Sequence, residues 1–290
     1  MQSNGGQLIK HLRNKMGVAQ AELAKKLFIT QSKLSRIEDG QAEFSILEFK
    51  TAFSLLGHPT DDLWLAFLTV EEFEAYLQYR EIKQVLALGR DVGNARDACL
   101  SFIESSLAKR PFFSPIVAVV KVRLDEEMPE EQKLATLNAA FGKNAELHSL
   151  TQDQTIVANE IALTYAKIGQ RHKAIALLDG VVHNLDNSRM TLPEQYDTVP
   201  KISADFVTLL VEDQQYEKAA KVCENVRAAR HCRYRAQFNS VIAYALGVCY
   251  HKMNKDKQEY MYWLTAAYHT AKAVGQNDLA SKIAKEYGIQ

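Results

Sequence analysis

Apolar residues in the first sixty positions recur every third or fourth residue, in four short runs. This spacing places them on one face of a helix. Glycine readily takes the left-handed conformation that ends a helix, and one follows three of the runs. Thr30 can cap the third run, and Ser45 with Glu48 can form a capping box for the fourth. The pattern therefore predicts four short helices, whose inward residues and closing glycines are Ile9, Leu12, Met16 and Gly17; Leu23, Ala24 and Leu27; Leu34, Ile37 and Gly40; and Ile46, Phe49, Phe53, Leu56 and Gly57.

The second and third predicted helices are joined by a three-residue turn, the arrangement of a helix-turn-helix. In the segments Gln20-Ala-Glu-Leu-Ala24 and Gln31-Ser-Lys-Leu-Ser-Arg-Ile-Glu-Asp-Gly40 the sequence resembles the Xre/λ-repressor-type DNA-binding domain. It departs from that family at Ala19, which replaces a Ser or Thr cap, and at Phe28, which replaces a turn glycine. We expect the missing cap to cost roughly 1 kcal/mol of helix stability. We also expect the turn to be built slightly differently.

The resemblance implies that a recognition helix, from Gln31 to about Asp39, enters the major groove of double-stranded DNA. Gln31 and Ser32 would then hydrogen-bond to bases, and Lys33 would reach a base or a phosphate. Similarity to the family also places three further side chains on phosphates or neighbouring base edges. These are Gln20, Ser35 and Arg36.

Two alternatives to DNA contact stay open. The exposed residues could belong to an ordinary small helical domain and face only solvent. Arg36 could pair with Glu38 or Asp39 instead of DNA. If the domain does bind DNA, one copy offers few contacts, so a homodimer on two half-sites about 34 Å apart is expected.

Pro59 interrupts the pattern and separates a first domain, residues 1–58, from a linker helix over residues 59–80. Thr60, Asp61 and Asp62 would open this helix with acidic side chains at its positive end. Its apolar face is aromatic and would either contact a second subunit or pack on its own chain. The face consists of Trp64, Phe67, Phe73 and Tyr76.

Residues 81–290 form the remaining predicted domain, in which residues 159–182 resemble a tetratricopeptide repeat (TPR). Two weaker copies follow, further apart than the family's 34 residues. This spacing predicts lengthened helices or inserted loops, for example around Asn187–Pro200. In the first copy the resemblance is carried by Ala162, Tyr165, Gly169, Ala174, Leu178 and Val181. In the second copy it is carried by Phe206, Leu210, Tyr216, Ala219, Cys223 and Val226, around the turn Asp213-Gln-Gln215. In the third copy it is carried by Leu246, Gly247, Tyr250, Trp263 and Ala266.

The segment Ser114–Leu124 would read as a strand in isolation, but its repeat context predicts a helix. We expect degenerate repeats over residues 81–150. The predicted fold class is therefore all-α: an N-terminal Xre/λ-repressor-like helix-turn-helix bundle followed by a right-handed TPR-like helical solenoid.

In such a solenoid the first helix of each pair lines a concave groove. Asn and Lys side chains there can hold the backbone of an extended peptide, while Tyr and apolar neighbours take its side chains. Asn159 is the strongest candidate, because asparagine is otherwise unfavourable in mid-helix. Each position could instead be merely exposed to solvent. The candidate peptide-binding residues are Asn159, Leu163, Lys167, Lys201, Ala204, Thr208, Glu212, Tyr244, Val248, His251 and Lys252.

Composition narrows the function classes. With 47% apolar residues the chain is not a disordered one. The net charge is zero, but residues 1–57 hold eight Lys and Arg against five Asp and Glu, a weak indication of nucleic-acid binding. Apolar stretches such as Ser240–Tyr250 fall short of the ~20 residues of a membrane span, and no signal-peptide pattern is present. We therefore expect a cytoplasmic protein with no membrane partner.

The four cysteines, Cys99, Cys223, Cys232 and Cys249, lack the CxxC spacing of a zinc site, and we expect buried, reduced thiols. The sequence contains no HExxH, P-loop or GxSxG motif. We expect neither a metal, nor a cofactor, nor an enzyme activity, and we expect the acidic run Asp125–Glu131 to be a solvated loop.

An Xre-type head followed by helical repeats resembles the RRNPP family of quorum-sensing regulators, and within it the PlcR-like and Rgg-like transcription factors. The stretch Ala158-Asn-Glu-Ile-Ala-Leu-Thr-Tyr-Ala and the overall layout carry this resemblance. It implies a homodimer that binds a DNA operator and, in the repeat groove, a short signalling peptide. The alternative is an Xre-type repressor whose repeat domain binds a protein partner or only dimerises.

Overall fold

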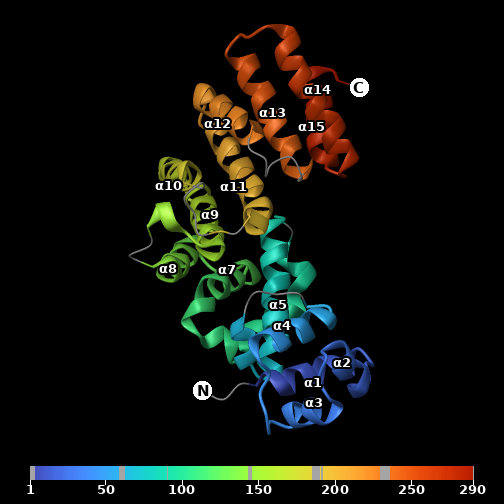
Figure 1. Ribbon diagram of the computed structural model, residues 1–290. Coiled ribbons are helices and arrows are strands. Elements are labelled where there is room, and N and C mark those ends of the chain that lie inside the picture. The colour runs from blue at the N-terminus through green and yellow to red at the C-terminus, as the bar shows by residue number, and fades with distance from the viewer. Residues whose placement is uncertain are drawn as a thin grey trace. The chain divides into compact units, whose positions relative to one another are not determined.

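The computed structural model describes residues 4–58, 63–89, 91–142, 146–184, 190, 192–228 and 236–289. Every regular element in these ranges is a helix, so the predicted all-α class is confirmed (Figure 1). The chain divides into two compact units. The first consists of Met1–Arg80 with Leu100–Arg110, and the second of Glu81–Cys99 with Pro111–Gln290.

The first unit begins with four short helices, as the sequence predicts. α1 packs against α3 and α4, and α2 packs against α3. Leu8, Leu23, Leu34 and Phe53 are fully buried between them. The helices are α1 (Gly5–Lys15), α2 (Gln20–Lys26), α3 (Gln31–Glu38) and α4 (Ile46–Leu55), followed by the 3₁₀ helix η1 (Leu63–Phe67) and by α5 (Val70–Ala87), which continues into the second unit.

The predicted helix signals are confirmed in detail. The Thr30 hydroxyl accepts a hydrogen bond from the Lys33 backbone N–H at 3.1 Å. Ser45 and Glu48 form both bonds of the capping box, at 3.3 and 2.9 Å. The closing glycines, Gly17, Gly40 and Gly57, all have positive φ.

Two side chains predicted to point inward do not. Ile46 is 67% exposed and Met16 is 52% exposed. Ile46 directly follows the capping residue of α4, and Met16 follows the last residue of α1. At these helix ends no neighbouring turn covers the side chain. The apolar periodicity therefore predicted burial of these two side chains wrongly.

The predicted linker begins outside the described residues, at Pro59, Thr60, Asp61 and Asp62. Farther along, the predicted single helix is wrong, because η1 ends at Phe67 and α5 begins only at Val70. Phe67 is 41% exposed, but the other three aromatic rings pack within the first unit. The Trp64 ring lies 5.2 Å from that of Tyr76, and the Phe73 ring lies 5.4 Å from that of Phe53. This packing supports the alternative in which the aromatic face binds its own chain.

The second unit is a succession of helices that pack on the next helix in the chain and, for α7, α9, α11 and α13, also on the next but one. Ser114–Leu124 is a helix, as predicted. The long helices are α7 (Ser114–Leu124), α8 (Glu130–Phe141), α9 (Gln152–Lys167), α10 (Arg171–His183), α11 (Leu192–Glu212), α12 (Tyr216–Ala228), α13 (Ala236–Lys252), α14 (Lys257–Ala273) and α15 (Asn277–Tyr287). Shorter elements are η2 (Val92–Ala95), α6 (Arg96–Glu104), η3 (Leu107–Lys109), η4 (Pro111–Phe113) and η5 (Leu147–Ser149), of which the end of α6 and η3 belong to the first unit.

Small residues bring the paired helices together. Ala162 and Ala174 are fully buried where α9 and α10 pack, and Gly169 turns the corner between them with φ of +79°. In the third copy, a Cβ at Gly247 would lie 2.7 Å from Leu264 Cγ on α14. On α14, however, the pattern misplaced both residues of the third copy by one position. Trp263 and Ala266 are half-buried, whereas Leu264 and Ala267 are fully buried.

The extra length between the repeats is mainly helix. α11 has 21 residues and begins at Leu192, so of the two alternatives, lengthened helices or inserted loops, the lengthened helix is confirmed from that residue onward. Pro200 lies buried inside α11. Proline removes one backbone donor from a helix, yet α11 continues through Pro200.

Cys99, Cys223 and Cys249 are buried free thiols, as predicted, whereas Cys232 lies outside the described residues. Burial raises the pKa of the Cys249 thiol to about 12. Among the described helices, none combines the length and the apolar character that a membrane crossing requires.

Candidate functional sites

A buried ion pair fixes α3 in the first unit. Glu38, at the end of α3, is 2% exposed and accepts hydrogen bonds from Arg13 Nε at 2.8 Å and Arg13 Nη2 at 2.9 Å. The third guanidinium nitrogen of Arg13 donates to the Val18 carbonyl at 2.9 Å. The hydrogen bond to Glu38 raises the pKa of Arg13 above its ordinary value. The pair therefore ties α1, the following turn and α3 into one body.

Glu38 also orients two of the predicted DNA-binding residues. Gln20 Nε2 donates to Glu38 Oε2 at 3.0 Å, and Gln31 Nε2 donates to Gln20 Oε1 at 3.5 Å. Because an ionised carboxylate only accepts hydrogen bonds, the amide nitrogen of Gln20 must face Glu38. The amide oxygen of Gln20 is thereby directed toward Gln31, at the start of α3.

Other predicted DNA-binding residues lie on or near the exposed side of α3. Ser32, Lys33 and Arg36 are exposed, and Ser35 is half-buried, with its hydroxyl 3.5 Å from Asp39 Oδ2. Lys33 Nζ contacts Glu48 Oε1 on α4 at 2.5 Å. Hydrogen bonds from Lys33, and then from the Ser45 backbone, lower the pKa of Glu48.

The two acids that could have neutralised Arg36 have other partners. Glu38 binds Arg13, and Asp39 accepts a hydrogen bond from Lys10 at 2.9 Å. Within the described ranges of the chain, no ion pair involves Arg36. Its guanidinium therefore remains exposed beside the other candidate DNA-binding groups.

The turn before α3 has an ordinary backbone despite its unusual residue. The Phe28 N–H donates to the Lys25 carbonyl at 3.2 Å, and the Ile29 N–H donates to the Ala24 carbonyl at 3.1 Å. These two bonds form a Schellman motif, in which Phe28 holds the left-handed position with φ of +56°. The expectation of a differently built turn is therefore wrong: phenylalanine adopts the conformation that glycine usually supplies.

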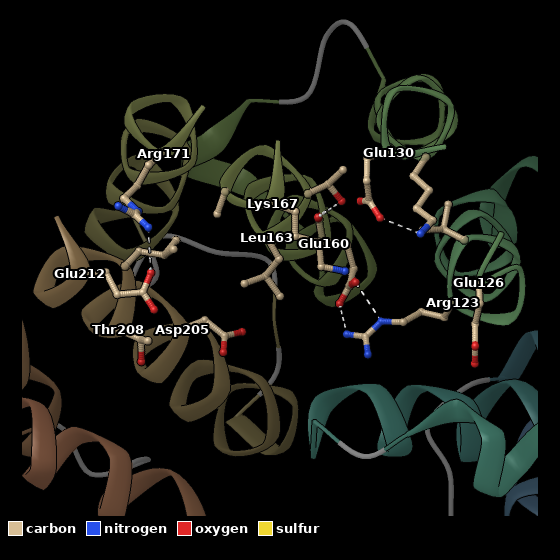
Figure 2. A pocket seen from close by; sticks show the side chains of 15 residues that line it. Arg123, Glu126, Glu130, Glu160, Leu163, Lys167, Arg171, Asp205, Thr208 and Glu212 are labelled. Atoms are coloured by element: carbon tan, nitrogen blue, oxygen red, sulfur yellow. Dashed lines mark hydrogen bonds and ion pairs between the residues drawn. The ribbon is translucent and has the colours of Figure 1, made fainter. Parts of the chain in front are cut away.

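The second unit contains a cavity of ≈ 820 Å³ bordered by α7 to α11 (Figure 2). It brings together four of the predicted peptide-binding residues, which come from α9 and α11. Its lining consists of Val122, Arg123, Glu126, Glu130, Lys133, Glu160, Leu163, Thr164, Ala166, Lys167, Arg171, Asp205, Thr208, Leu209 and Glu212, of which Leu163, Lys167, Thr208 and Glu212 were predicted.

Most charges around the cavity are paired. Figure 2 shows Arg123 reaching Glu160, whose Oε2 lies 2.9 Å from Arg123 Nε, and Arg171 meeting Glu212 at 3.3 Å. Lys167 is different, because no ion pair to it occurs within the described residues. The cavity therefore offers an ammonium group that an anionic part of a ligand could pair with.

Asn159 is not among the residues that line the cavity, but it is held by one of them, Asp205. Its Nδ2 donates to Asp205 Oδ2 at 2.7 Å, and Lys201 Nζ pairs with the same oxygen. Asn159 is 4% exposed, and its Oδ1 has no hydrogen-bond donor among the described residues. Since Asp205 requires a donor, the amide cannot turn over, and Oδ1 remains a buried acceptor. A buried acceptor without a partner is costly, and a ligand N–H would satisfy it.

The other predicted peptide-binding residues lie elsewhere. Ala204 is buried, and Lys201 is turned onto Asp205. On α13, Val248 is buried and Lys252 is exposed. These positions follow the repeat pattern but do not line the cavity.

The C-terminal helix provides partners for the remaining two, Tyr244 and His251. The Tyr244 hydroxyl lies 3.3 Å from Glu286 Oε2, and burial together with Glu286 raises the pKa of Tyr244 to about 12. The His251 ring lies 5.7 Å from that of Tyr287. The ring of Tyr260, on α14, lies closer to that of His251, at 4.7 Å, so these two positions of the third repeat contact both α14 and α15.

Sequence reasoning missed one side of the cavity, because residues 81–150 show no clear repeat. Glu126 and Glu130 line the cavity although the acidic run seemed to be only a solvated loop. Asp205 could have been noticed from its spacing of four residues from Lys201, which pairs such side chains on one helix. In the described part of the chain, no three His, Cys, Asp or Glu side chains form a group that could hold a metal.

The fold thus defines a class: an all-α chain with a helix-turn-helix head and a helical-repeat unit that contains a ligand-sized cavity. A scan against protein-family models and a search of curated proteins find no match to the sequence. Solved structures, however, share the fold over nearly the whole chain. Bacillus thuringiensis PlcR, in complex with the peptide PapR7 and DNA, matches with a TM-score of 0.70 and 16% sequence identity, covering 98% of this chain and 100% of PlcR.

Two further structures share this fold. The SHP pheromone receptor Rgg2(C45S) of Streptococcus dysgalactiae has a TM-score of 0.56 and 14% identity, with 98% of each chain covered. ComR of S. thermophilus, in complex with DNA and its signalling peptide ComS, has a TM-score of 0.56 and 12% identity, with 97% of each covered. The resemblance to PlcR-like and Rgg-like proteins is therefore confirmed at the level of the fold.

Proposed function

We propose that this chain is a sequence-specific DNA-binding transcriptional regulator, controlled by a short signalling peptide that binds in the cavity of the second unit. The observation that carries the proposal is the buried Asn159 Oδ1, fixed as an acceptor by the bond from Asn159 to Asp205, which lines this cavity. The shared fold with PlcR and ComR, whose structures contain DNA and a peptide, supports the proposal.

In the proposed DNA complex, Gln31 reads a base edge and Gln20 fixes its amide. A glutamine amide can donate and accept at once, so it can form two hydrogen bonds to an adenine. Lys33 reaches a base or a phosphate, either after its ion pair with Glu48 breaks or while it keeps that ion pair. Arg36, Ser35 and Ser32 then contact phosphates or neighbouring bases, which sets the register of α3 on the DNA.

In the proposed peptide complex, the ligand lies extended along α9 and α11. A backbone N–H of the peptide donates to Asn159 Oδ1, and a carboxylate of the peptide pairs with Lys167. Leu163 and Leu209 offer apolar contact beside these polar groups. The cavity volume lies within the usual ~300–1,000 Å³ of small-ligand sites, so it accommodates a short peptide rather than a folded domain.

Control by the peptide requires that it bind one arrangement of the protein better than another, since a ligand with equal affinity for both shifts neither. We propose a cytoplasmic homodimer, in which two heads occupy two half-sites and the peptide changes how readily they do so. The rival function is a repressor whose repeat unit binds a protein partner or only dimerises.

DNA binding is tested first. A duplex selected by the full chain from a random DNA pool serves as the probe, at a fixed salt concentration. Arg36→Ala should weaken DNA binding several-fold. It should also reduce the slope of log affinity against log salt concentration by about one, because one phosphate contact is lost. Arg96→Ala, which removes an exposed arginine of the second unit, serves as the control and should change neither. Equal affinity of Arg36→Ala and the wild type would contradict the role of Arg36.

Ligand binding is tested by native mass spectrometry after incubation with fractionated medium from the protein's own host. A discrete, peptide-sized gain in mass is expected for the wild type and not for Asn159→Ala. Asn138→Ala, an exposed asparagine within α8, is the matched control and should bind like the wild type. If Asn159→Ala gains the same mass, the ligand does not use Asn159. If the wild type gains nothing and a host protein co-purifies instead, the rival function is favoured.

A further inference from the structure

Phe28 combines two unfavourable features in the turn between α2 and α3. Its side chain is 97% exposed, more than any other large apolar side chain in the described ranges. Its backbone has φ of +56°, a left-handed conformation that costs residues with a Cβ roughly 1–2 kcal/mol. A glycine would remove both penalties and keep both hydrogen bonds of the Schellman motif. A single exposed apolar residue is ordinary, but one held in a strained conformation indicates a function.

The position of Phe28 indicates what its ring meets. Leu27 is 7% exposed and Ile29 is half-buried, so Phe28 alone of these three apolar residues projects fully into solvent. Two residues later, Thr30 caps α3, whose first turn carries Gln31. In a helix-turn-helix this end of the recognition helix lies against base edges in the major groove. The ring is therefore placed on the approach to the bases that α3 would read.

The chemistry of the side chain selects its contact. A phenyl ring has no hydrogen-bond donor and no positive charge, so it gains little from a phosphate. The major groove contains one exposed apolar group, the C5-methyl of thymine, and phenylalanine is among the residues that pack on it.

We propose that Phe28 is a specificity-determining residue, whose ring packs on the C5-methyl of a thymine adjacent to the base read by Gln31. The inference rests on the proposed DNA binding. It explains why the turn retains a strained, exposed aromatic residue in place of glycine.

The test compares the full-length wild type with Phe28→Gly and Phe28→Asn on the duplex that the wild type selects from a random pool. Both replacements tolerate the left-handed conformation. Phe28→Gly should therefore raise the midpoint of thermal unfolding of the first unit while it lowers the affinity for the duplex. Phe112→Ala, which removes an exposed phenylalanine of the second unit, should leave the affinity unchanged.

Replacement of each thymine by uracil then removes one methyl group at a time. At one thymine beside the Gln31 contact, uracil should weaken wild-type binding about fourfold, the effect of burying one methyl group. The same replacement should leave Phe28→Gly unaffected, because the two changes remove the same contact.

Three results would overturn the proposal in distinguishable ways. If Phe28→Gly binds like the wild type while Arg36→Ala is still weakened, DNA binding stands and Phe28 has no part in it. If Phe28→Gly is weaker but no thymine distinguishes the two proteins, the ring does not read a base. If the wild type enriches no sequence at all, the proposed function fails and this inference fails with it.

Discussion

Replacement of Glu38 by alanine should destabilise the first unit more than any change to a surface ion pair. The replacement leaves the guanidinium of Arg13, whose side chain is 11% exposed, without its carboxylate partner. It also removes the acceptor for Gln20 Nε2. Three hydrogen bonds to a buried carboxylate, two from Arg13 and one from Gln20, are lost together.

The size of the loss follows from this burial. Removal of one partner of a buried ion pair typically costs about 3–5 kcal/mol, because the remaining charge stays out of water. Arg13 retains its bond to the Val18 carbonyl and a little solvent contact, so we expect the lower end, about 3 kcal/mol. The exposed pair Glu22–Lys26, with side chains 51% and 50% exposed, is the matched control. Glu22→Ala should cost no more than about 0.5 kcal/mol.

The chain offers a probe specific to this unit. It has two tryptophans, Trp64 in the first unit and Trp263 in the second. In a Trp263→Phe background, fluorescence of Trp64 during urea unfolding reports on the first unit alone. The double variant Arg13→Met with Glu38→Leu should recover most of the lost free energy of unfolding, because it leaves no buried charge unpaired.

The stabilising role of the Arg13–Glu38 pair would be refuted if Glu38→Ala lowered the free energy of unfolding no more than Glu22→Ala does. It would also be refuted if the double variant were as unstable as Glu38→Ala. In either case the stability of the first unit would depend on its apolar core, and the Arg13–Glu38 ion pair would only orient Gln20.

Two other predictions concern the first unit. Gly6→Ala should lower the free energy of unfolding of the first unit by about 2 kcal/mol. The reason is that a Cβ at Gly6 would lie 2.0 Å from the Ile37 carbonyl oxygen and would push α1 away from α3. If the urea midpoint measured by Trp64 fluorescence did not change, α1 and α3 would be able to separate without cost. Burial, and then the charge of Arg80, lower the pKa of His58 below its ordinary 6.5. The contribution of neutral His58 to the free energy of unfolding is therefore fully present above about pH 6.5. It is lost as the pH falls through the lowered pKa of the folded state. His58→Leu should flatten the pH dependence of the urea midpoint, measured by Trp64 fluorescence, below pH 6.5. If the midpoint changed with pH equally in the wild type and the variant, groups other than His58 would cause that pH dependence.

Local signals in the sequence account for most of the secondary structure. Thr30, Ser45 and Glu48 cap helices where their types and spacing predicted, because a cap involves only backbone three residues away. The same locality explains the errors. Periodicity placed Ile46 inside although it sits at a helix end, and the repeat pattern marked Trp263 and Ala266 on α14 although Leu264 and Ala267 are the buried residues there.

The candidate DNA-binding residues were predictable because they form a short, continuous motif. The cavity was predictable only in part, because one of its sides comes from α7, α8 and the turn between them, which show no repeat signature. The bond between Asn159 and Asp205 joins residues 46 positions apart. No spacing rule specifies such a contact.

The sequence by itself determined the helices, their caps, the faces they bury and the order of the two kinds of unit. These follow from interactions within a few residues along one helix. Only the tertiary structure decided which side chains meet: that Glu38 binds Arg13, that Asp205 holds Asn159, and that Tyr244 reaches Glu286 of α15. Such pairings depend on packing between helices distant in the chain, where small differences in length and side-chain volume set which groups come together.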